Sequence, residues 1–135
     1  MSRHGFKDLI AWQKGKDLAV KIYHVTGNGA LSKDFGMRDQ LRRSAVSIAS
    51  NLAEGDERDT DKDAVRFFFI AKGSLAELRT QLLICCEVGL LNQSDFEHLE
   101  SDCATLAKML GSLIKFRQSA ERHEQRKSSR DRGHI

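Results

Sequence analysis

The strongest constraint on the fold lies between residues 64 and 85, where small or apolar side chains recur at alternating intervals of four and three. This average interval places the set along one side of an α-helix and suits knobs-into-holes packing against other helices. The chain contains no proline, so nothing forces a long helix to break. We predict a helix over residues 61–88, with Thr60 as its N-cap, Asp63 at the matching third position and Gly89 after its end. The residues of the set are Ala64, Phe68, Ala71, Leu75, Leu78, Leu82 and Cys85.

Three further segments carry apolar residues at helical spacing. The first covers residues 7–26, and the second covers residues 33–54, from N-cap candidates at 32–34 to Gly55, which is suited to the left-handed position after a helix. The last covers residues 95–120, with Ser94 as its predicted N-cap and Glu97 as the reciprocal partner. Their apolar stripes comprise Trp12, Gly15, Ala19, Ile22 and Tyr23; Met37, Leu41, Ala45, Ile48 and Leu52; and Leu99, Cys103, Leu106, Leu110 and Leu113.

Four amphipathic helices with short connections predict an all-α fold, an antiparallel up-down four-helix bundle over residues 1–116. Residues 117–135 are polar and basic, and we predict that they form a flexible C-terminal tail. From Lys115 to Ile135 there are seven Lys or Arg and three Asp or Glu, a net charge of +4, whereas the whole chain carries +3. The positive charge is therefore concentrated at the C-terminal end.

Membrane-spanning and disulfide-rich classes are disfavoured. The longest apolar runs have five residues, far fewer than the ~20 that cross a bilayer, and the first residues contain no apolar stretch of signal-peptide length. We therefore expect a soluble cytoplasmic protein. Cys85, Cys86 and Cys103 form no C-x-x-C pair, and we interpret them as small apolar side chains of the core.

The sequence also argues against catalysis, metals and cofactors. Asp59, Asp61 and Asp63 have the spacing of a calcium loop, but Ala64 and Ile70 occupy the positions that need glycine and a bidentate glutamate. The spacing of a di-iron site is approached only by one Asp-x-x-His at residues 95–98, and no phosphate-binding loop is present. We predict a protein that is not an enzyme and needs no cofactor or metal.

A second apolar set follows the 4–3 spacing on the opposite side of the 61–88 helix. One interpretation is a wide core stripe with incidental surface residues. The preferred interpretation is a subunit interface, because a helix that is apolar on two opposite sides is normally buried on both. The candidate interface comprises Phe69, Gly73, Ala76, Thr80, Leu83 and Ile84.

The helix over residues 33–54 has two different flanks beside its apolar stripe. The flank with Arg42, Val46, Ala49 and Ala53 suits close packing by a neighbouring helix. The polar flank could be simply solvated, could form a network between helices or subunits, or could hold a ligand. Within a network, Arg42–Glu77 and Arg43–Glu54 would be natural pairs. The candidate network comprises Gln40, Ser47, Asn51, Glu54, Lys72 and Glu77, with Ser44, Ser74 and Gln81 nearby.

Three stretches together resemble a bacterial four-helix bundle family first known from intervening sequences within large-subunit rRNA genes. They are "FKDLIAWQKGKDLAVKIY" (6–23), "QLRRSAVSIASNLAEG" (40–55) and "FIAKGSLAELRTQL" (69–82), and the resemblance covers residues 6–116. It implies a homopentamer, since the related accessory proteins of diversity-generating retroelements are similar rings that bind nucleic acid and a reverse transcriptase. It implies no settled activity. The chain departs from the family pattern at Ala49, where proline is favoured, and at Arg79, where glutamate is favoured, and its 56–63 loop is more acidic.

Two functions remain in view. The preferred hypothesis is a non-catalytic homo-oligomeric scaffold that binds nucleic acid by charge, with RNA favoured and DNA as the other candidate. The alternative is a protein–protein interaction module that binds a partner protein and no nucleic acid. The candidate nucleic-acid-binding residues are Arg38, Arg42, Arg43, Arg122, Arg126, Lys127, Arg130 and Arg132.

Overall fold

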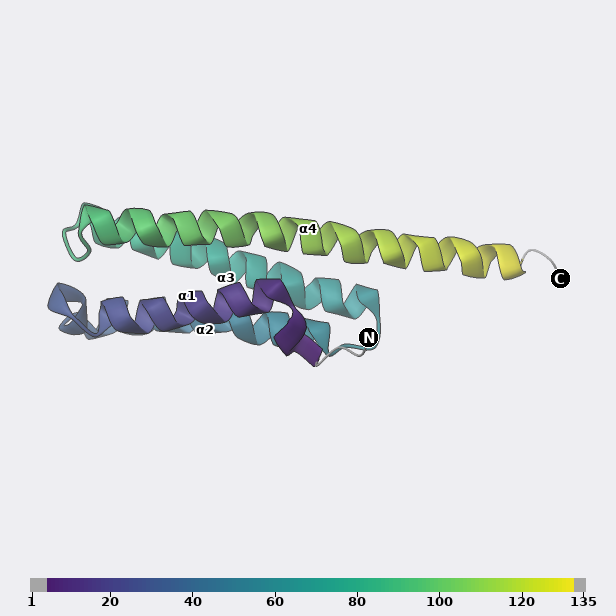
Figure 1. Ribbon diagram of the computed structural model, residues 1–135, viewed down its shortest axis with the longest axis horizontal. Helices are drawn as coiled ribbons and strands as arrows, with labels where there is room; N and C mark the ends of the chain where they lie inside the picture. The colour runs from purple at the N-terminus through teal and green to yellow at the C-terminus, as the bar shows by residue number, and fades with distance from the viewer. Residues whose placement is uncertain (1–4, 133–135) are drawn as a thin grey trace.

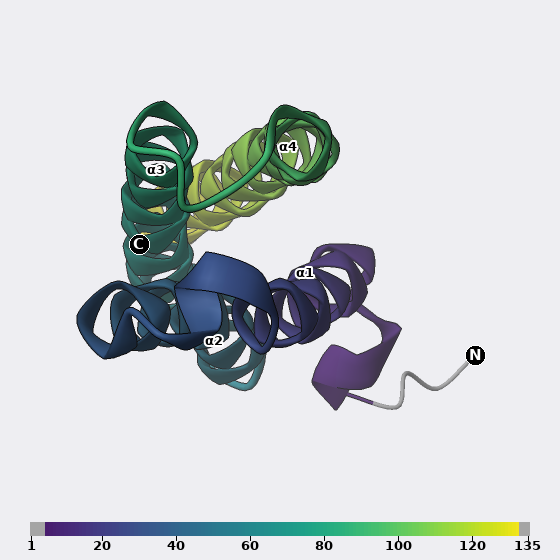
Figure 2. The same ribbon diagram turned by 90° about the vertical axis from the view of Figure 1, so that its left-hand side faces the viewer.

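The computed structural model describes residues 5–132, which form four α-helices and two short 3-10 helices, with no strand among them. Successive α-helices run in opposite directions (Figure 1), and Figure 2 shows α3 and α4 in one layer over α1 and α2 in the other. The prediction of an all-α fold with four helices is confirmed. The elements are η1 (Gly5–Asp8), α1 (Ile10–Thr26), η2 (Gly29–Ser32), α2 (Phe35–Asp56), α3 (Asp61–Glu87) and α4 (Gln93–Arg132).

The 4–3 set of α3 forms the centre of the core. All seven of its residues are at most 1% exposed. They meet the predicted stripe of α2, of which Leu41, Ala45, Ile48 and Leu52 are buried, and the α4 residues Leu99, Cys103, Leu106 and Leu110. Apolar residues at intervals of three and four therefore identified the core-facing side of three helices correctly.

The predicted stripe of α1 is only partly correct. Ile22 and Gly15 are buried, but Tyr23 is exposed and Trp12 is half-buried. Trp12 packs against the edge of the core and also makes an edge-to-face contact with Phe6, with ring centroids 5.0 Å apart. The helix is rotated so that Leu18, which the prediction left out, faces the core.

Two helix ends depend on side chains that accept backbone N–H groups. The Asp34 carboxylate accepts the Met37 N–H at 3.1 Å, and the Thr60 hydroxyl accepts the Asp63 N–H at 3.2 Å, as predicted for α3. Gly89 follows α3 with a positive φ of 82°. Its left-handed backbone lets the Leu90 N–H reach back to the Cys85 carbonyl at 2.8 Å and ends the helix.

The predicted role of Gly55 is wrong. Gly55 lies inside α2, and it has no positive φ. A Cβ atom at this position would lie 2.7 Å from Cε1 of Phe68, so glycine is needed because α3 comes so close. Helix α2 consequently continues to Asp56, beyond the predicted end.

Both predicted ends of α4 need correction. The side chain of Asn92, rather than Ser94, accepts the Asp95 N–H at 2.8 Å, while Asn92 Nδ2 donates to the Asp95 carboxylate at 3.1 Å. At its other end α4 continues to Arg132 instead of stopping near residue 120, and it projects past the other helices (Figure 1). Residues 117–132 are rich in Arg, Glu, Gln and Lys, which are good helix formers. Residues 133–135 of the predicted tail lie outside the described part of the chain.

Candidate functional site

The outer side of α3 is an exposed apolar surface, which we call the α3 face. Phe69, Leu83 and Ile84 are 48%, 47% and 43% exposed. Gly73 has nothing within 4 Å of a built Cβ, and the Thr80 hydroxyl donates to the Ala76 carbonyl at 2.9 Å, which satisfies it within the helix. Ile70, which the prediction left out, extends the surface. The α3 face comprises Phe69, Ile70, Gly73, Ala76, Thr80, Leu83 and Ile84.

A second apolar surface, the α1–α2 groove, follows the outer side of α1 and α2. Its central hollow has a volume of about 540 Å³ and is lined almost entirely by carbon. A further hollow adjoins each end along α2, one beside Arg42 and Arg43 and the other beside Glu54 and Glu57. The residues of the central hollow are Phe6, Trp12, Lys16, Ala19, Val20, Tyr23, His24, Val46, Ala49, Ser50 and Ala53.

The small-residue flank of α2 therefore has two neighbours. Helix α1 packs closely against it, since a built Cβ on Gly15 lies 3.7 Å from the Cα of Ala49. The rest of the flank, with Ala53 and Val46, forms the floor of the groove. The sequence indicated the close packing but not the groove, because Trp12 and Tyr23 of α1 were assigned to the core.

The three predicted arginines of α2 differ in their contacts. The guanidinium of Arg42 lies 4.4 Å over the Tyr23 ring and donates to the Thr26 hydroxyl at 2.9 Å, so it faces α1 rather than the predicted partner Glu77. Arg38 lies 4.7 Å over the Phe35 ring and pairs with a carboxylate on the next residue. Arg43 is exposed.

The polar flank of α2 forms a hydrogen-bond network with α3 inside the chain. The buried Ser44 donates to Gln81 Oε1 at 3.0 Å, and the hydroxyls of Ser47 and Ser74 lie 2.8 Å apart. Asn51 donates to the Ser47 carbonyl at 2.9 Å. Of the predicted members, Gln40 and Glu77 accept from Gln81 at 3.5 and 3.3 Å, whereas Glu54 and Lys72 lie exposed. Of the three interpretations, a network between helices fits these contacts.

Arg117 belongs to the bundle and not to a basic tail. It pairs with Asp61, its guanidinium lies 3.8 Å from a carboxylate oxygen of Asp56, and all three side chains are largely buried. Its guanidinium also lies 5.8 Å from the Phe68 ring centroid. Part of the acidic 56–63 loop is therefore neutralised by α4, at the point where α4 leaves the bundle.

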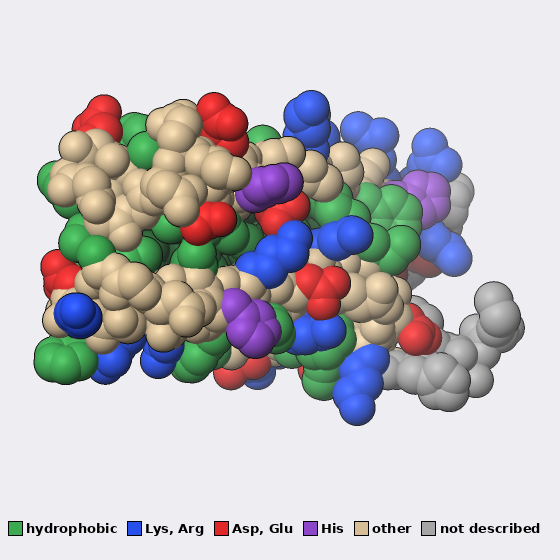
Figure 3. Space-filling model, turned by 60° about the vertical axis from the view of Figure 1, so that its left-hand side comes forward, with side chains coloured by type: hydrophobic (Ala, Val, Ile, Leu, Met, Phe, Trp, Pro, Cys, Tyr) green, Lys and Arg blue, Asp and Glu red, His purple; other side chains and the backbone are tan. Residues whose placement is uncertain are grey.

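Charges on the projecting part of α4 are sorted by side. At about 100° per residue, five exposed cations share the side opposite Leu106 and Leu110, which face the core. Glu121, Glu124 and Asp131 lie on the other side of the helix. Figure 3 shows Lys and Arg side chains gathered over this end. We call the row the α4 ridge; it comprises Lys108, Lys115, Arg122, Arg126 and Arg130.

Of the two other predicted cations at this end, Lys127 is exposed on the flank of the ridge, and the side chain of Arg132 lies outside what the structure describes. Phe116 is 70% exposed beside Lys115. The sequence indicated the basic composition of this end. It did not indicate that cations and acids lie on different sides, because that separation requires the helix to continue past residue 120.

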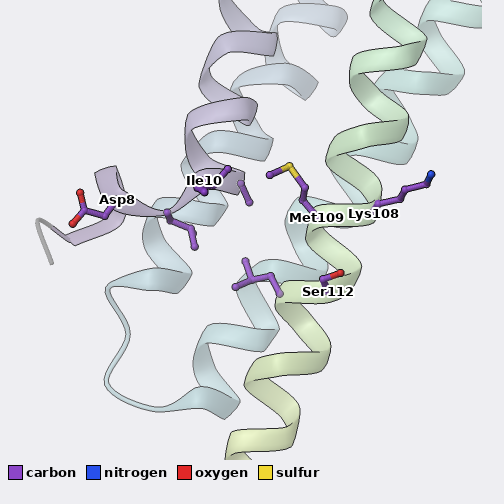
Figure 4. A pocket seen from close by; sticks show the side chains of 8 residues that line it. Asp8, Ile10, Lys108, Met109 and Ser112 are labelled. Carbon is purple, nitrogen blue, oxygen red and sulfur yellow. The ribbon is translucent and has the colours of Figure 1, made fainter. Parts of the chain in front are cut away.

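The boundary between α1 and α4 is less tightly closed than the one between α2 and α3. An open hollow of about 600 Å³ lies where α1 begins. In Figure 4, Met109 projects from α4 toward α1, whereas Asp8 and Lys108 point away from the gap. Further along, the Lys21 ammonium pairs with the Asp102 carboxylate at 2.7 Å and ties the two helices together.

The sequence of this bundle was compared with those of known proteins. Residues 7–112 match the 23S rRNA-intervening sequence protein family. The chain belongs to this family. It is also similar to the crystal structure of a protein of unknown function from the S23 ribosomal protein family of Bacteroides thetaiotaomicron, with 26% identity and a TM-score of 0.72 over 78% of this chain and 98% of that one. Comparison with curated proteins gave no match. The predicted family is confirmed, and the relation to retroelement accessory proteins stays a prediction.

The family match covers most of the bundle of this family member but not the C-terminal part of α4. The family match ends at residue 112, so Arg122, Arg126 and Arg130 of the α4 ridge lie beyond it. Almost the whole of the Bacteroides protein matches only 78% of this chain, so part of this chain has no counterpart there. The α3 face and, apart from Phe6, the groove lie within the family match.

Arg79 occupies a position at which the sequence resemblance predicts glutamate. Its Nε donates to Glu100 of α4 at 3.1 Å. The pair links α3 to α4 with a charge-assisted hydrogen bond.

The buried thiols of this family member are poor nucleophiles. Burial raises the pKa of the Cys85 thiol to about 11 and that of Cys103 to about 12. Both therefore stay protonated near neutral pH, and the thiolate is the reactive form. Among the residues that the structure describes, no group of His, Cys, Asp and Glu gathers to hold a metal ion. None of the described helices has the length and apolar composition of a membrane span.

Proposed function

We propose that this protein is a non-catalytic homo-oligomeric scaffold that binds nucleic acid, preferentially RNA, through the α4 ridge. The observation that carries the proposal is the separation of charge along the projecting part of α4. Arg122, Arg126 and Arg130 follow one another at four-residue intervals, about 6 Å apart along the axis. A row of arginines with the acids turned away suits contact with successive phosphates.

The ridge supports binding with little sequence selectivity. Its cations can contact phosphates, but such contacts position a protein without reading bases. Phe116 is the exposed aromatic ring beside the ridge, and it offers a surface on which an unpaired base can stack. Unpaired bases are common in RNA loops and ends, which favours RNA over duplex DNA.

Self-association is the second part of the proposal. The chain leaves two different apolar surfaces open, the α3 face and the α1–α2 groove. Surfaces of this kind usually mark contacts with partners. Two unlike surfaces suit a head-to-tail arrangement, which closes into a ring when the rotation between subunits permits. The family resemblance favours five subunits, and a ring would place several α4 ridges on one particle.

A salt series tests the nucleic-acid part. Labelled single-stranded RNA, single-stranded DNA and duplex DNA are titrated with the full chain between about 50 and 200 mM salt, the range over which phosphate contacts weaken binding strongly. The variant Arg122→Gln/Arg126→Gln/Arg130→Gln removes three ridge charges. Lys7→Gln/Lys14→Gln/Lys33→Gln, at exposed lysines outside the ridge and the α3 face, is the matched control.

The ridge variant is expected to bind more weakly and to reduce the slope of log affinity against log salt by roughly 2 to 3, because each phosphate contact contributes about 0.7 to 0.9. The control variant is expected to keep most of the slope. Binding that is absent or insensitive to salt, or an equal loss in both variants, would contradict the proposal.

The second candidate function, a protein–protein interaction module, is favoured by a different observation. The α3 face and, apart from Phe6, the α1–α2 groove lie within the family match, whereas Arg122, Arg126 and Arg130 of the α4 ridge lie beyond it. A defined protein partner that co-purifies with the chain and is lost on Phe69→Ala, with no retention of RNA or DNA, would favour this alternative.

A further inference from the structure

The α3 face and the α1–α2 groove are complementary in shape and apolar character. The groove has small side chains, Ala49 and Ala53, along its floor. The α3 face has bulky side chains at Phe69 and Leu83, with Gly73 and Ala76 between them. Small residues at the middle of a helix allow a close approach to a second helix. The bulky side chains of the α3 face can therefore fill the space above the small side chains of the groove.

Both surfaces also carry opposite charges at their two ends. On α3, Lys62, Arg66 and Lys72 surround the N-terminal half of the face, where Arg66 also pairs with Asp63 at 3.5 Å, and Glu77 and Glu87 surround its C-terminal half. The charges along the groove follow the same order as on α3, because basic residues come first and acidic residues second along α2. Arg42 and Arg43 lie at its α2 N-terminal end and Glu54 and Glu57 at the other.

Each groove end also contains one group of the opposing sign. Asp39 at the basic end is paired with Arg38 at 3.2 Å, and Arg58 at the acidic end has its guanidinium 4.3 Å over the Phe67 ring. The polarity of the groove therefore comes from the two arginines and the two glutamates.

The spacing of these charges fixes an orientation and a register. Arg66 and Glu77 are eleven residues apart, and so are Arg43 and Glu54, about 17 Å in both cases at the rise of an α-helix. If α3 lies antiparallel to α2, Arg66 faces Glu54 while Glu77 faces Arg43. In this register Phe69 comes level with the part of α2 between Ala49 and Ala53. A parallel orientation would instead place like charges together at both ends.

We propose that the α3 face of one copy docks in the α1–α2 groove of a second copy, with α3 antiparallel to the partner's α2 and with Arg66 opposite Glu54. The inference rests on the self-association in the proposed function and names its contact. Pairing of two α3 faces would bring two rows of bulky side chains together and leave both grooves open. Docking into the groove buries both surfaces in every copy of a closed ring.

A charge swap at this contact tests the inference. The full chain, Glu54→Arg, Arg66→Glu and the double variant are compared by light scattering and sedimentation at several concentrations, with circular dichroism to check folding. Both positions are exposed, so the single variants are expected to keep the fold. Glu97→Arg, on the exposed side of α4, is the matched control.

Each single variant is expected to weaken association at least about tenfold, because it places like charges together at a complementary contact. The double variant is expected to regain most of the lost affinity, and Glu97→Arg is expected to have no effect. Phe69→Ala is expected to weaken association as well, since the ring would fill the groove.

The outcomes separate this inference from the proposal on which it rests. If the unaltered chain is a 15.2 kDa monomer at micromolar concentration, self-association itself fails. If it is an oligomer that both single variants leave intact, the contact is wrong while the scaffold stands. If Arg66→Glu weakens association and Glu54→Arg does not, the α3 face docks on some other surface. Loss in both single variants without recovery in the double variant would also overturn the proposed register.

Discussion

The two sides of α3 have apolar residues at the same spacing, but one side is buried and the other is exposed. The inner side, from Ala64 to Cys85, is covered by α2 and α4, whereas the outer side, from Phe69 to Ile84, is open in the single chain. Both follow intervals of four and three. Periodicity therefore indicates which residues share a side of a helix, and the number of available neighbours determines which side is covered. The comparison can be tested with matched substitutions on the two sides.

The largest difference is expected between two leucines of α3. Leu78 is 0% exposed and Leu83 is 47% exposed. Leu78→Ala is expected to lower the free energy of unfolding by about 2 to 5 kcal/mol, because it leaves a cavity in the core. Leu83→Ala is expected to change it by less than about 1 kcal/mol in the single chain.

Urea unfolding at a concentration where the chain is monomeric measures both values. If Leu83→Ala cost as much as Leu78→Ala under that condition, the outer side would be packed within the chain. A cost for Leu83→Ala that appears only at high concentration would instead indicate that another copy covers the outer side.

Two glycines give the next largest contrast. Gly55 faces the inner side of α3, and an added methyl group would meet Phe68 and the Ala64 carbonyl at 3.0 Å or less. Gly55→Ala is expected to destabilise the fold by about 1 to 3 kcal/mol through overpacking. Gly73→Ala, on the outer side, is expected to stabilise the single chain by up to about 1 kcal/mol through helix propensity.

Thermal unfolding of the two glycine variants measures these opposite changes in stability. A stabilised Gly55→Ala variant would show that α2 and α3 can separate at this crossing without loss. In an assembled form, Gly73→Ala is expected to lose part of its benefit if a second helix packs closely there.

The smallest expected effect concerns pH. Burial raises the pKa of the Cys103 thiol from an ordinary 9.0 to about 12. The protonated form is favoured by the folded state, so its contribution is complete below pH 9 and is lost as pH rises toward 12. Between pH 9 and 10 the loss is about 1 kcal/mol for this thiol.

Urea midpoints at pH 8 and pH 10 measure the loss, and Cys103→Ala is expected to show a smaller fall between them than the unaltered chain. An equal fall in both proteins would assign the pH dependence to other groups. The half-exposed Cys86 provides an internal comparison, since a thiol reagent is expected to modify it before the fully buried Cys85.

The sequence was sufficient for the features that α3 determines alone. The core side of α3, its Thr60 cap and its end at Gly89 depend on local spacing and backbone chemistry, and each was predicted correctly. Two errors arose where two elements meet. Gly55 was misread because its constraint comes from Phe68, and Arg42 because Tyr23 and Thr26 lie on another helix.

The end of α4 could not be located from apolar periodicity. That pattern stops near Phe116, but the helix continues to Arg132, since backbone hydrogen bonds and good helix formers need no apolar stripe. Asn92 was overlooked as the cap because Ser94 and Glu97 offered the same spacing two residues later. The α1–α2 groove was missed for a related reason, since Tyr23 and Trp12 are aromatic and were assigned to the core.

The continuation of α4 as a helix also affects how a polyanion would be bound. A coil would have to become ordered on contact, at an entropic cost for every residue fixed. Residues 117–132 already have their helical backbone, so this rod presents its cations at fixed intervals before any ligand arrives. Its calorimetric signature would be a near-zero heat-capacity change on association, in contrast to the strongly negative value that accompanies coupled folding.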